Sequence, residues 1–244
     1  MKRVLITGAT SGIGLALAKK YLTMNYNVVA CGRNIEALER LQVSAEVMQG
    51  QLNIVQFDLL DKAELTAALS DIEPLDIVIL NAGSCEYIDD VTHFDGDLFA
   101  RVIQTNVIAV GYCLAALIPY INRGGHLALM GSSAAYVPFQ RAQAYGASKA
   151  AIHYLADSLR LDTDPNVLGI SLIAPGFVKT PLTDKNDFSM PMQVSADQAA
   201  EVIFTGIKKN NREIHFPFPF TFFLKFMGLL PRGLWYWLAL RMKR

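Results

Sequence analysis

The sequence predicts a single α/β domain in which a doubly wound parallel sheet carries helices on both faces. Short apolar runs rich in β-branched residues alternate along the chain with stretches whose apolar residues recur every three or four positions. Strands that alternate with helices in this way pair in parallel through right-handed crossovers. The length of 244 residues suits one such sheet, and a hydrophobic content of 52% against 18% charged residues supports a large core.

The elements follow from this alternation. Six strands are expected, at residues 4–7, 27–31, 53–57, 76–80, 126–130 and 169–173. Five amphipathic helices are expected between them, at residues 13–24, 35–44, 62–69, 98–118 and 144–161. A polar loop at 183–194 that we expect to be mobile precedes a helix capped by Ser195 and Gln198, and a last strand is expected at 212–216. We assign residues 1–212 to the catalytic domain and 213–244 to an apolar extension of it.

The composition excludes several classes of function. The 22 Lys and Arg residues balance 22 Asp and Glu residues, so no global field favours nucleic acid as a partner. The cysteines (Cys31, Cys85, Cys113) and histidines (His93, His126, His153, His215) lack metal-ligand spacing, so we expect no metal, reduced buried thiols and structural histidines. The N-terminus lacks the apolar run of a signal peptide, which predicts a cytoplasmic protein.

A phosphate-binding turn is predicted where the first strand meets the first helix. The segment reads Thr7-Gly8-Ala9-Thr10-Ser11-Gly12-Ile13-Gly14. Glycines let the backbone approach a ligand closely, while the free amides and the dipole of a helix N-terminus favour an anion. The expected cofactor contacts in this turn are Gly8, Thr10, Ser11, Gly12, Ile13 and Gly14.

The end of the second strand predicts which dinucleotide is bound. An NAD site has a carboxylate here to bind the ribose 2′-hydroxyl, but this chain has Gly32 followed by Arg33. The Arg33 guanidinium suits a 2′-phosphate, because the two groups form charge-assisted hydrogen bonds. The sequence therefore favours NADP over NAD, with Arg33 as an ordinary solvated loop residue as the alternative.

Four motifs in order resemble the short-chain dehydrogenase/reductase family, in its compact single-domain branch. They are Thr7-Gly8-x-x-x-Gly12-x-Gly14, Asn81-Ala82-Gly83, Tyr145-x-x-x-Lys149 and Pro175-Gly176, and the resemblance covers roughly residues 2–182. It implies a Rossmann-like fold, NAD(P)-dependent interconversion of an alcohol and a carbonyl, and a homo-oligomer. The further cofactor contacts that it implies are Asp58, Asn81, Ala82, Gly83, Tyr145, Lys149, Pro175, Gly176, Val178 and Thr180.

The spacing of Tyr145 and Lys149 supports acid/base chemistry. Residues four apart on a helix lie on one face, so the ammonium is expected one turn from the phenol. A nearby cation stabilises a phenolate, so we expect a lowered pKa for Tyr145, which would act as the general acid/base.

Two further polar positions complete the expected catalytic set. Ser132 and Ser133 end the fifth strand, at the edge where such sheets bind ligands, and one hydroxyl should polarise the substrate oxygen. The strand exit favours Ser133, whereas the family's usual spacing before the tyrosine favours Ser132; we choose Ser133. By resemblance, Asn106 is the family's active-site asparagine, which holds a water that links the lysine to solvent.

The C-terminal residues 214–244 are dense in aromatic side chains and contain Lys225, Arg232, Arg241, Lys243 and Arg244 but no acid. Leu234, Trp237 and Leu238 recur at helical spacing, which predicts an apolar helix face. Three interpretations stay open: burial against the sheet or a second subunit, a lid over a lipophilic substrate, and shallow contact with a membrane through residues 216–244.

Together these observations predict an NADP-preferring oxidoreductase that acts on a rather apolar alcohol or carbonyl, with NADPH preferred over NADH. The catalytic set is Ser133, Tyr145, Lys149 and Asn106. The alternative is a redox-sensing regulatory or scaffold protein that binds NADP(H) without turnover, against which the intact Tyr145 and Lys149 pair argues.

Overall fold

A seven-stranded parallel sheet forms the centre of the molecule, with the strand order β3-β2-β1-β4-β5-β6-β9. The computed structural model describes residues 1–241. The strands are β1 (Arg3–Thr7), β2 (Asn27–Gly32), β3 (Gln51–Gln56), β4 (Leu75–Leu80), β5 (Ile121–Met130), β6 (Leu168–Pro175) and β9 (Glu213–Phe216). The order reverses between β1 and β4, which places a ligand crevice at the carboxyl ends of these strands.

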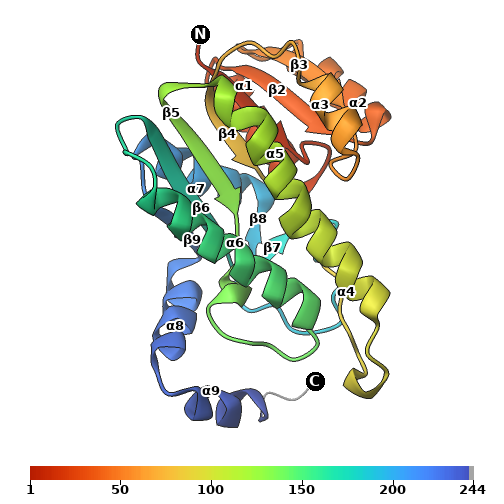
Figure 1. Cartoon of the computed structure of the whole chain (residues 1–244), viewed down its shortest axis with the longest axis vertical. Helices are drawn as coiled ribbons and strands as arrows, with labels where there is room; N and C mark the ends of the chain where they lie inside the picture. Colours follow the sequence, from red (N-terminus) through yellow and green to blue (C-terminus); the bar gives the residue numbers. More distant parts are fainter. Residues whose placement is uncertain (242–244) are drawn as a thin grey trace.

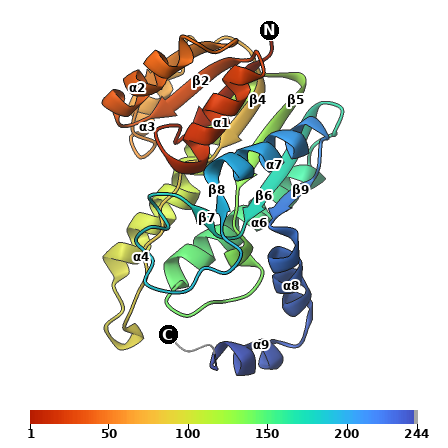
Figure 2. The same cartoon turned by 180° about the vertical axis from the view of Figure 1, so that it is seen from behind.

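Helices cover both faces of this sheet, as predicted. One layer consists of α1 (Gly12–Thr23), α2 (Ile35–Ala45) and α7 (Ala196–Lys208), and Figure 2 shows α1 and α7 in front of the strands. The other consists of α3 (Lys62–Ala68), α4 (Gly96–Ile103), α5 (Ala109–Leu117) and α6 (Gln143–Leu161), with α5 and α6 in front in Figure 1. The Rossmann-like, doubly wound fold is confirmed.

The long connecting helix predicted at 98–118 differs most from expectation on this side. It is interrupted by a π-helical turn, η2 (Gln104–Ile108), which separates α4 from α5. A 3₁₀ turn, η3 (Ile118–Tyr120), then leads into β5, which begins five residues before the predicted strand. The whole stretch Gly96–Tyr120 has the length and apolar character of a membrane span, with a mean hydropathy of 1.7. It belongs to the helical layer, since Val102, Cys113 and Leu117 are buried.

The loop predicted at 183–194 contains turns and one short strand. β8 (Val194–Ser195) pairs with β7 (Val178–Lys179), and this pairing ties the end of the loop to the segment after β6. The predicted capping box begins α7, because the Gln198 amide donates to Ser195 Oγ at 3.1 Å and the Ser195 amide to Gln198 Oε1 at 2.9 Å.

Residues 217–241, here called the C-terminal arm, extend beyond the edge of the sheet. The arm consists of α8 (Phe218–Leu229) and α9 (Arg232–Ala239), which Figures 1 and 2 show in blue at one end of the molecule. Its buried side chains Leu224, Met227 and Trp235 pack with Val137 in the segment after β5. Thr221 and Lys225 of α8 also contact His215 and Glu213 of β9, so the arm is anchored both on that segment and on the edge strand of the sheet. Of the basic residues at the C-terminus, Arg241 is described by the structure, whereas Lys243 and Arg244 lie outside the described residues.

Candidate active site

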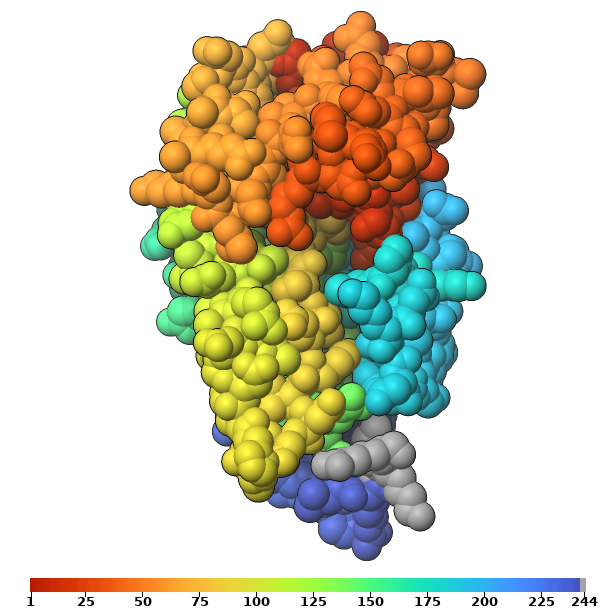
Figure 3. Space-filling view, turned by 90° about the vertical axis from the view of Figure 1, so that its right-hand side faces the viewer, coloured from red at the N-terminus to blue at the C-terminus, as the bar shows by residue number. Residues whose placement is uncertain are grey.

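Two adjoining cavities lie at the carboxyl ends of the strands. The glycine-loop cavity, of about 370 Å³, lies between the ends of β1, β2, β4 and β6. The aromatic cavity, of about 530 Å³, lies between the segments after β4, β5 and β6 and the C-terminal arm. Figure 3 shows a narrow cleft on this side, between the yellow and the cyan segments. Tyr145, Gly176, Leu182 and Thr183 line both cavities, so the two cavities adjoin at these residues.

The glycine loop has the geometry of a phosphate cradle. Gly8 and Gly12 have φ angles of 67° and 53°, a conformation that side chains disfavour. A Cβ atom on Gly14 would lie 2.1 Å from the Gly8 carbonyl oxygen, so only glycine permits this close turn into α1. The predicted contacts that line the cavity are Gly8, Thr10, Ser11, Gly12 and Ile13, whereas Gly14 packs beneath the loop.

The rim of this cavity brings together Arg33 and Asp58, whose side chains form an ion pair at 3.5 Å. The Arg33 side chain is 72% exposed, so its guanidinium is free to turn toward an anion. At the end of β2, a Cβ atom on Gly32 would lie 2.6 Å from the Thr10 methyl group. A carboxylate-bearing residue therefore does not fit at position 32 unless Thr10 moves.

The remaining predicted cofactor contacts lie along the same cavity. They are Asn81, Ala82, Gly83, Pro175, Gly176, Val178 and Thr180. Asn81 holds β1 and β4 together, because its Nδ2 donates to the Thr7 carbonyl and its backbone amide to Thr7 Oγ1, both at 3.0 Å. A Cβ on Gly83 would lie 3.4 Å from Lys149 Nζ, so this position keeps the floor of the cavity open.

Tyr145 and Lys149 lie one turn apart on α6 and both are enclosed. Lys149 Nζ donates to the Met130 carbonyl at 2.9 Å and lies 5.8 Å from the centroid of the Tyr145 ring. Burial lowers the pKa of Lys149 to about 8 and raises the pKa of Tyr145 above its usual value. The expected lowering of the Tyr145 pKa was therefore wrong for this structure, because burial outweighs the nearby cation. A neutral phenol next to the cavity suits a proton donor.

The two serines after β5 differ in what their side chains contact. The Ser132 hydroxyl faces the Tyr145 phenol and acts to lower the pKa of that phenol, and its Oγ also accepts from the Ala134 amide at 3.1 Å. Both serines line the aromatic cavity, and Ser133 begins a 3₁₀ turn, η4 (Ser133–Ala135). The contact with Tyr145 thus favours Ser132, in contrast to our choice of Ser133. The chain turns into η4 directly after Ser132, and which of the two serines is catalytic stays a prediction.

Asn106 is buried within the π-helical turn. Its Oδ1 accepts from the Ser84 amide at 2.8 Å, and its Nδ2 donates to the Ser84 carbonyl and to Ser148 Oγ, both at 2.9 Å. These bonds join η2 to the segment after β4 and to α6. Asn106 therefore fixes the backbone next to Gly83, and its contacts are with Ser84 and Ser148 rather than with Lys149.

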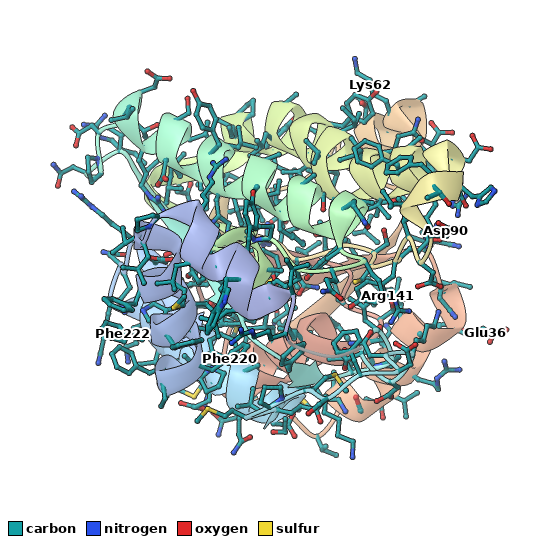
Figure 4. The ribbon with its side chains drawn as sticks, turned by 90° about the horizontal axis from the view of Figure 1, so that it is seen from below. Glu36, Lys62, Asp90, Arg141, Phe220 and Phe222 are labelled. Atoms are coloured by element: carbon teal, nitrogen blue, oxygen red, sulfur yellow. The ribbon has the colours of Figure 1, made fainter. Side chains whose placement is uncertain are left out.

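The sequence did not identify most residues of the aromatic cavity. They include Cys85, Tyr87, Phe139, Arg141, Phe177, Phe188 and Phe220, contributed by four separate segments. Arg141 spans one side of this cavity, because its guanidinium pairs with Asp89 at 2.5 Å and with Asp187 at 2.7 Å. Figure 4 shows Arg141 and Phe220 on this side of the molecule. No motif links these residues, so only the folded chain brings them together.

A second polar network extends from the Ser132 backbone to β9 and α8. The Ser132 backbone amide donates to His153 Nε2 at 3.4 Å, and the His153 ring packs edge-on against Tyr136 at 5.4 Å. The Tyr136 hydroxyl donates to Glu213 at 2.5 Å, and Glu213 also pairs with Lys225 of α8. His153 follows Lys149 by four residues, so the spacing that identified Tyr145 and Lys149 also offered a signal for His153. Within residues 1–241, no group of three or more His, Cys, Asp or Glu side chains is arranged to hold a metal ion.

Comparison with known proteins assigns the family. The family model for short chain dehydrogenases matches residues 2–190 of this chain. The chain belongs to the short-chain dehydrogenase/reductase family. It is therefore an NAD(P)-dependent oxidoreductase, and the resemblance drawn from the four motifs is confirmed.

Relatives of this family match most of the chain. An uncharacterised oxidoreductase of Myxococcus xanthus is 30% identical over 96% of this chain and 94% of its own length. Dehydrogenase/reductase SDR family member 7B of Bos taurus is 28% identical over 96% of this chain and 78% of its own length.

Solved structures share the fold. A short-chain dehydrogenase from Sphingobium yanoikuyae in complex with NADPH has a TM-score of 0.79 and 22% identity, over 98% of this chain and 92% of that one. A short-chain dehydrogenase/reductase from Burkholderia phymatum in complex with NAD has a TM-score of 0.82 and 22% identity, over 92% of each chain.

Proposed function

We propose that this chain is an NADP-preferring oxidoreductase that interconverts an alcohol and a carbonyl on a rather apolar small molecule. The observation that carries this proposal is the place of Tyr145, which lines both the glycine-loop cavity and the aromatic cavity. A group with an exchangeable proton at this junction serves a reaction between a cofactor on one side and a substrate on the other.

The residues of the glycine-loop cavity fit a dinucleotide. The left-handed Gly8 and Gly12 and the close packing of Gly14 leave room for a diphosphate at the N-terminus of α1. Asp58, Val178 and Thr180 all line this cavity. We assign Asp58 to the adenosine end of the cofactor, and Val178 and Thr180 to its nicotinamide carboxamide. The bound nicotinamide supplies or accepts the hydride in this family's chemistry.

NADP is the better fit at the ribose. A side chain at position 32 would require Thr10 to move, and Arg33 carries an exposed guanidinium next to it. Solved relatives of the fold are described with NADPH in one case and NAD in another, so the preference of this chain rests on its own residues.

The catalytic set acts on the oxygen of the substrate. In the reduction, the Tyr145 hydroxyl donates a proton to the carbonyl oxygen as that oxygen gains negative charge, and in the oxidation it accepts the proton back. When Tyr145 has given up its proton, the Ser132 hydroxyl donates a hydrogen bond to the Tyr145 phenolate. The Lys149 cation stabilises the negative charge of that phenolate. Asn106 is a positioning residue that fixes Ser84 and α6.

The lining of the aromatic cavity supports an apolar substrate. Four phenylalanines contribute to its walls: Phe139, Phe177, Phe188 and Phe220. Among the described residues that line the cavity, the one cation is Arg141, and it is paired with two carboxylates. These residues therefore offer no unpaired cation for an anionic substrate. A cavity of about 530 Å³ accepts a molecule with a bulky ring or a folded alkyl chain next to its carbonyl.

We also propose that the protein is a homo-oligomer, by family resemblance. From the C-terminal arm we propose a peripheral contact with a membrane.

The function is tested by incubating the protein with NADPH and a panel of aldehydes, ketones and secondary alcohols, and following the absorbance of NADPH. We expect turnover of apolar carbonyls. Tight NADPH binding without turnover of any member of a broad panel would instead support the redox-sensing alternative.

A further inference from the structure

The outer face of the C-terminal arm is apolar although it faces solvent. Nine large apolar side chains of the arm are exposed: Phe218, Phe222, Phe223, Phe226, Leu229, Leu234, Tyr236, Trp237 and Leu240. Exposed apolar side chains that gather on one small segment are typical of an interaction site for a protein or a membrane. Figure 4 shows Phe222 at the outer edge of the molecule, pointing away from Phe220 and the cavity side.

Helix α8 is apolar on both of its faces. Leu224 and Met227 are buried against the body of the protein, whereas Phe218, Phe222 and Phe226 recur every four residues on the opposite side. The one charged side chain of α8, Lys225, pairs with Glu213. A helix that is apolar all round requires an apolar environment on its second face as well.

Helix α9 has the composition of a membrane-interface element. Trp235 anchors it, since its indole donates to the Pro138 carbonyl at 2.7 Å, while Tyr236 and Trp237 are each about half exposed. Arg232 and Arg241 are exposed at its two ends, and the Arg241 guanidinium lies 3.7 Å from the centroid of the Trp237 ring. Exposed aromatic rings with flanking cations are typical of the headgroup region of a bilayer.

The charge distribution decides between a bilayer and a second copy of the chain. Residues 214–244 contain five of the 22 basic residues and none of the 22 acidic ones, so residues 1–213 contain 17 basic and 22 acidic residues. A twofold contact between two arms would bring like charges together without acidic partners. An anionic bilayer attracts the arm and repels the rest of the molecule, which fixes the arm toward the lipid.

The arm also forms part of the substrate cavity. Phe220 and Ala239 line the aromatic cavity, and the Gln140 side chain donates to the Ala239 carbonyl at 3.1 Å. We propose that the C-terminal arm docks on the surface of an anionic lipid bilayer and that the substrate is an apolar carbonyl or alcohol dissolved in that bilayer. The second half of this proposal rests on the proposed oxidoreductase function, whereas the docking does not.

The docking is tested by co-sedimentation with vesicles. Wild-type protein is expected to sediment with phosphatidylcholine vesicles that contain phosphatidylserine, and less with phosphatidylcholine alone or at high salt. The variant F222S/F226S/W237S removes three exposed rings without touching the buried anchor and should bind at least about tenfold more weakly. The control F94S/Y154S removes exposed rings outside the arm and should bind as wild type does.

Each other outcome contradicts the docking. A wild-type protein that stays in the supernatant, or a triple variant that sediments like the control, overturns it. A triple variant that halves the mass measured by light scattering, with wild-type protein unbound to vesicles, identifies a second copy as the occupant. NADPH binding, followed by fluorescence, should be the same in all variants and serves as the folding control.

The substrate half has its own readout. The first substrate is dodecanal dissolved in the anionic vesicles at a low lipid concentration. The triple variant should reduce it at least about tenfold more slowly than wild type does. Butanal dissolved in buffer should be reduced at the same rate by both proteins. Equal rates on dodecanal overturn the bilayer as the source of substrate. If neither aldehyde nor any panel member is turned over, the proposed function fails, while the sedimentation result still decides the docking.

Discussion

The residues to which we assign the chemistry lie at the switch point of the sheet, and their types and spacing allowed many of them to be predicted from the sequence. The glycine loop, Asn81, Tyr145 and Lys149 all line the predicted cavity because each stands at a strand end or a helix start that the topology fixes. The choice between Ser132 and Ser133 depended on the direction of one side chain after the strand, which the sequence does not encode locally.

The two serines are separated by alanine substitution. Ser132→Ala removes the hydroxyl that faces the Tyr145 phenol and should lower kcat by about 100-fold, as the loss of one donor at a developing charge commonly does. Ser133→Ala should stay within a few fold of wild type. Steady-state kinetics with NADPH in excess measures both, and the reverse ranking would restore Ser133 as the functional serine.

The proposed preference for NADP rests on Arg33. Arg33→Ala should weaken NADPH binding by about 1.5–3 kcal/mol and leave NADH binding nearly unchanged, because only NADPH carries the 2′-phosphate. Arg40→Ala is the matched control, since Arg40 is a similarly exposed arginine on α2. Titration of cofactor fluorescence gives both dissociation constants. An equal loss for the two cofactors, or tighter binding of NADH by wild type, would contradict the assignment.

At the scale of elements, α6 contains Tyr145 and Lys149, the proposed reacting groups, and a polar network connects this helix to β9 and α8. Tyr145, Lys149 and His153 follow one another at four-residue spacing on α6, and the network through Tyr136 and Glu213 connects this face to the C-terminal arm. The sequence predicted α6 and the arm separately. Their connection could not be predicted, because it joins residues more than 70 positions apart through side chains of ordinary type.

His153 is expected to act as a positioning residue for Ser132. His153→Leu removes the acceptor of the Ser132 amide and should lower kcat by about tenfold, the effect of one lost hydrogen bond, with unchanged NADPH binding. His153→Gln keeps an acceptor and should recover most of the rate. Tyr154→Leu, on the exposed side of α6, is the control. A uniform loss of NADPH binding and melting temperature in both His153 variants would indicate a purely structural role.

At the scale of the whole molecule, the parallel sheet and the two helical layers followed from the alternation of strands and helices, but the outer surface did not. The π-helical turn η2, the aromatic cavity and the exposed face of the C-terminal arm depend on packing between segments that are distant in sequence. The apolar residues of α8 were visible in the sequence. The packing of Leu224, Met227 and Trp235 in one cluster determines which of these residues face the body of the protein and which face outward.

Buried histidine makes the stability of the whole fold sensitive to acid. Burial lowers the pKa of His126 from 6.5 to about 4, while its Nε2 lies 2.8 Å from Ser171 Oγ in the sheet. The unfolded chain takes up this proton near pH 6.5 and the folded chain only near 4, so the stability is present above pH 6.5 and is lost as the pH falls toward 4. The expected loss is on the order of 3 kcal/mol.

Urea unfolding at neutral pH and at about pH 5 measures this dependence. His126→Gln, which removes the titrating group, should show a flatter dependence on pH than wild type. His93→Gln changes an exposed histidine and is the control. Equal slopes in wild type and His126→Gln would contradict the role of His126.

The central claim is that Tyr145 exchanges a proton with the substrate oxygen at the junction of the two cavities. The most direct measurement compares NADPH oxidation by wild type and Tyr145→Phe on a carbonyl that wild type reduces, together with NADPH binding by fluorescence. We predict that Tyr145→Phe binds NADPH within a few fold of wild type but loses at least about 100-fold in turnover, as the loss of a general acid requires. Near-normal turnover in Tyr145→Phe would contradict the claim.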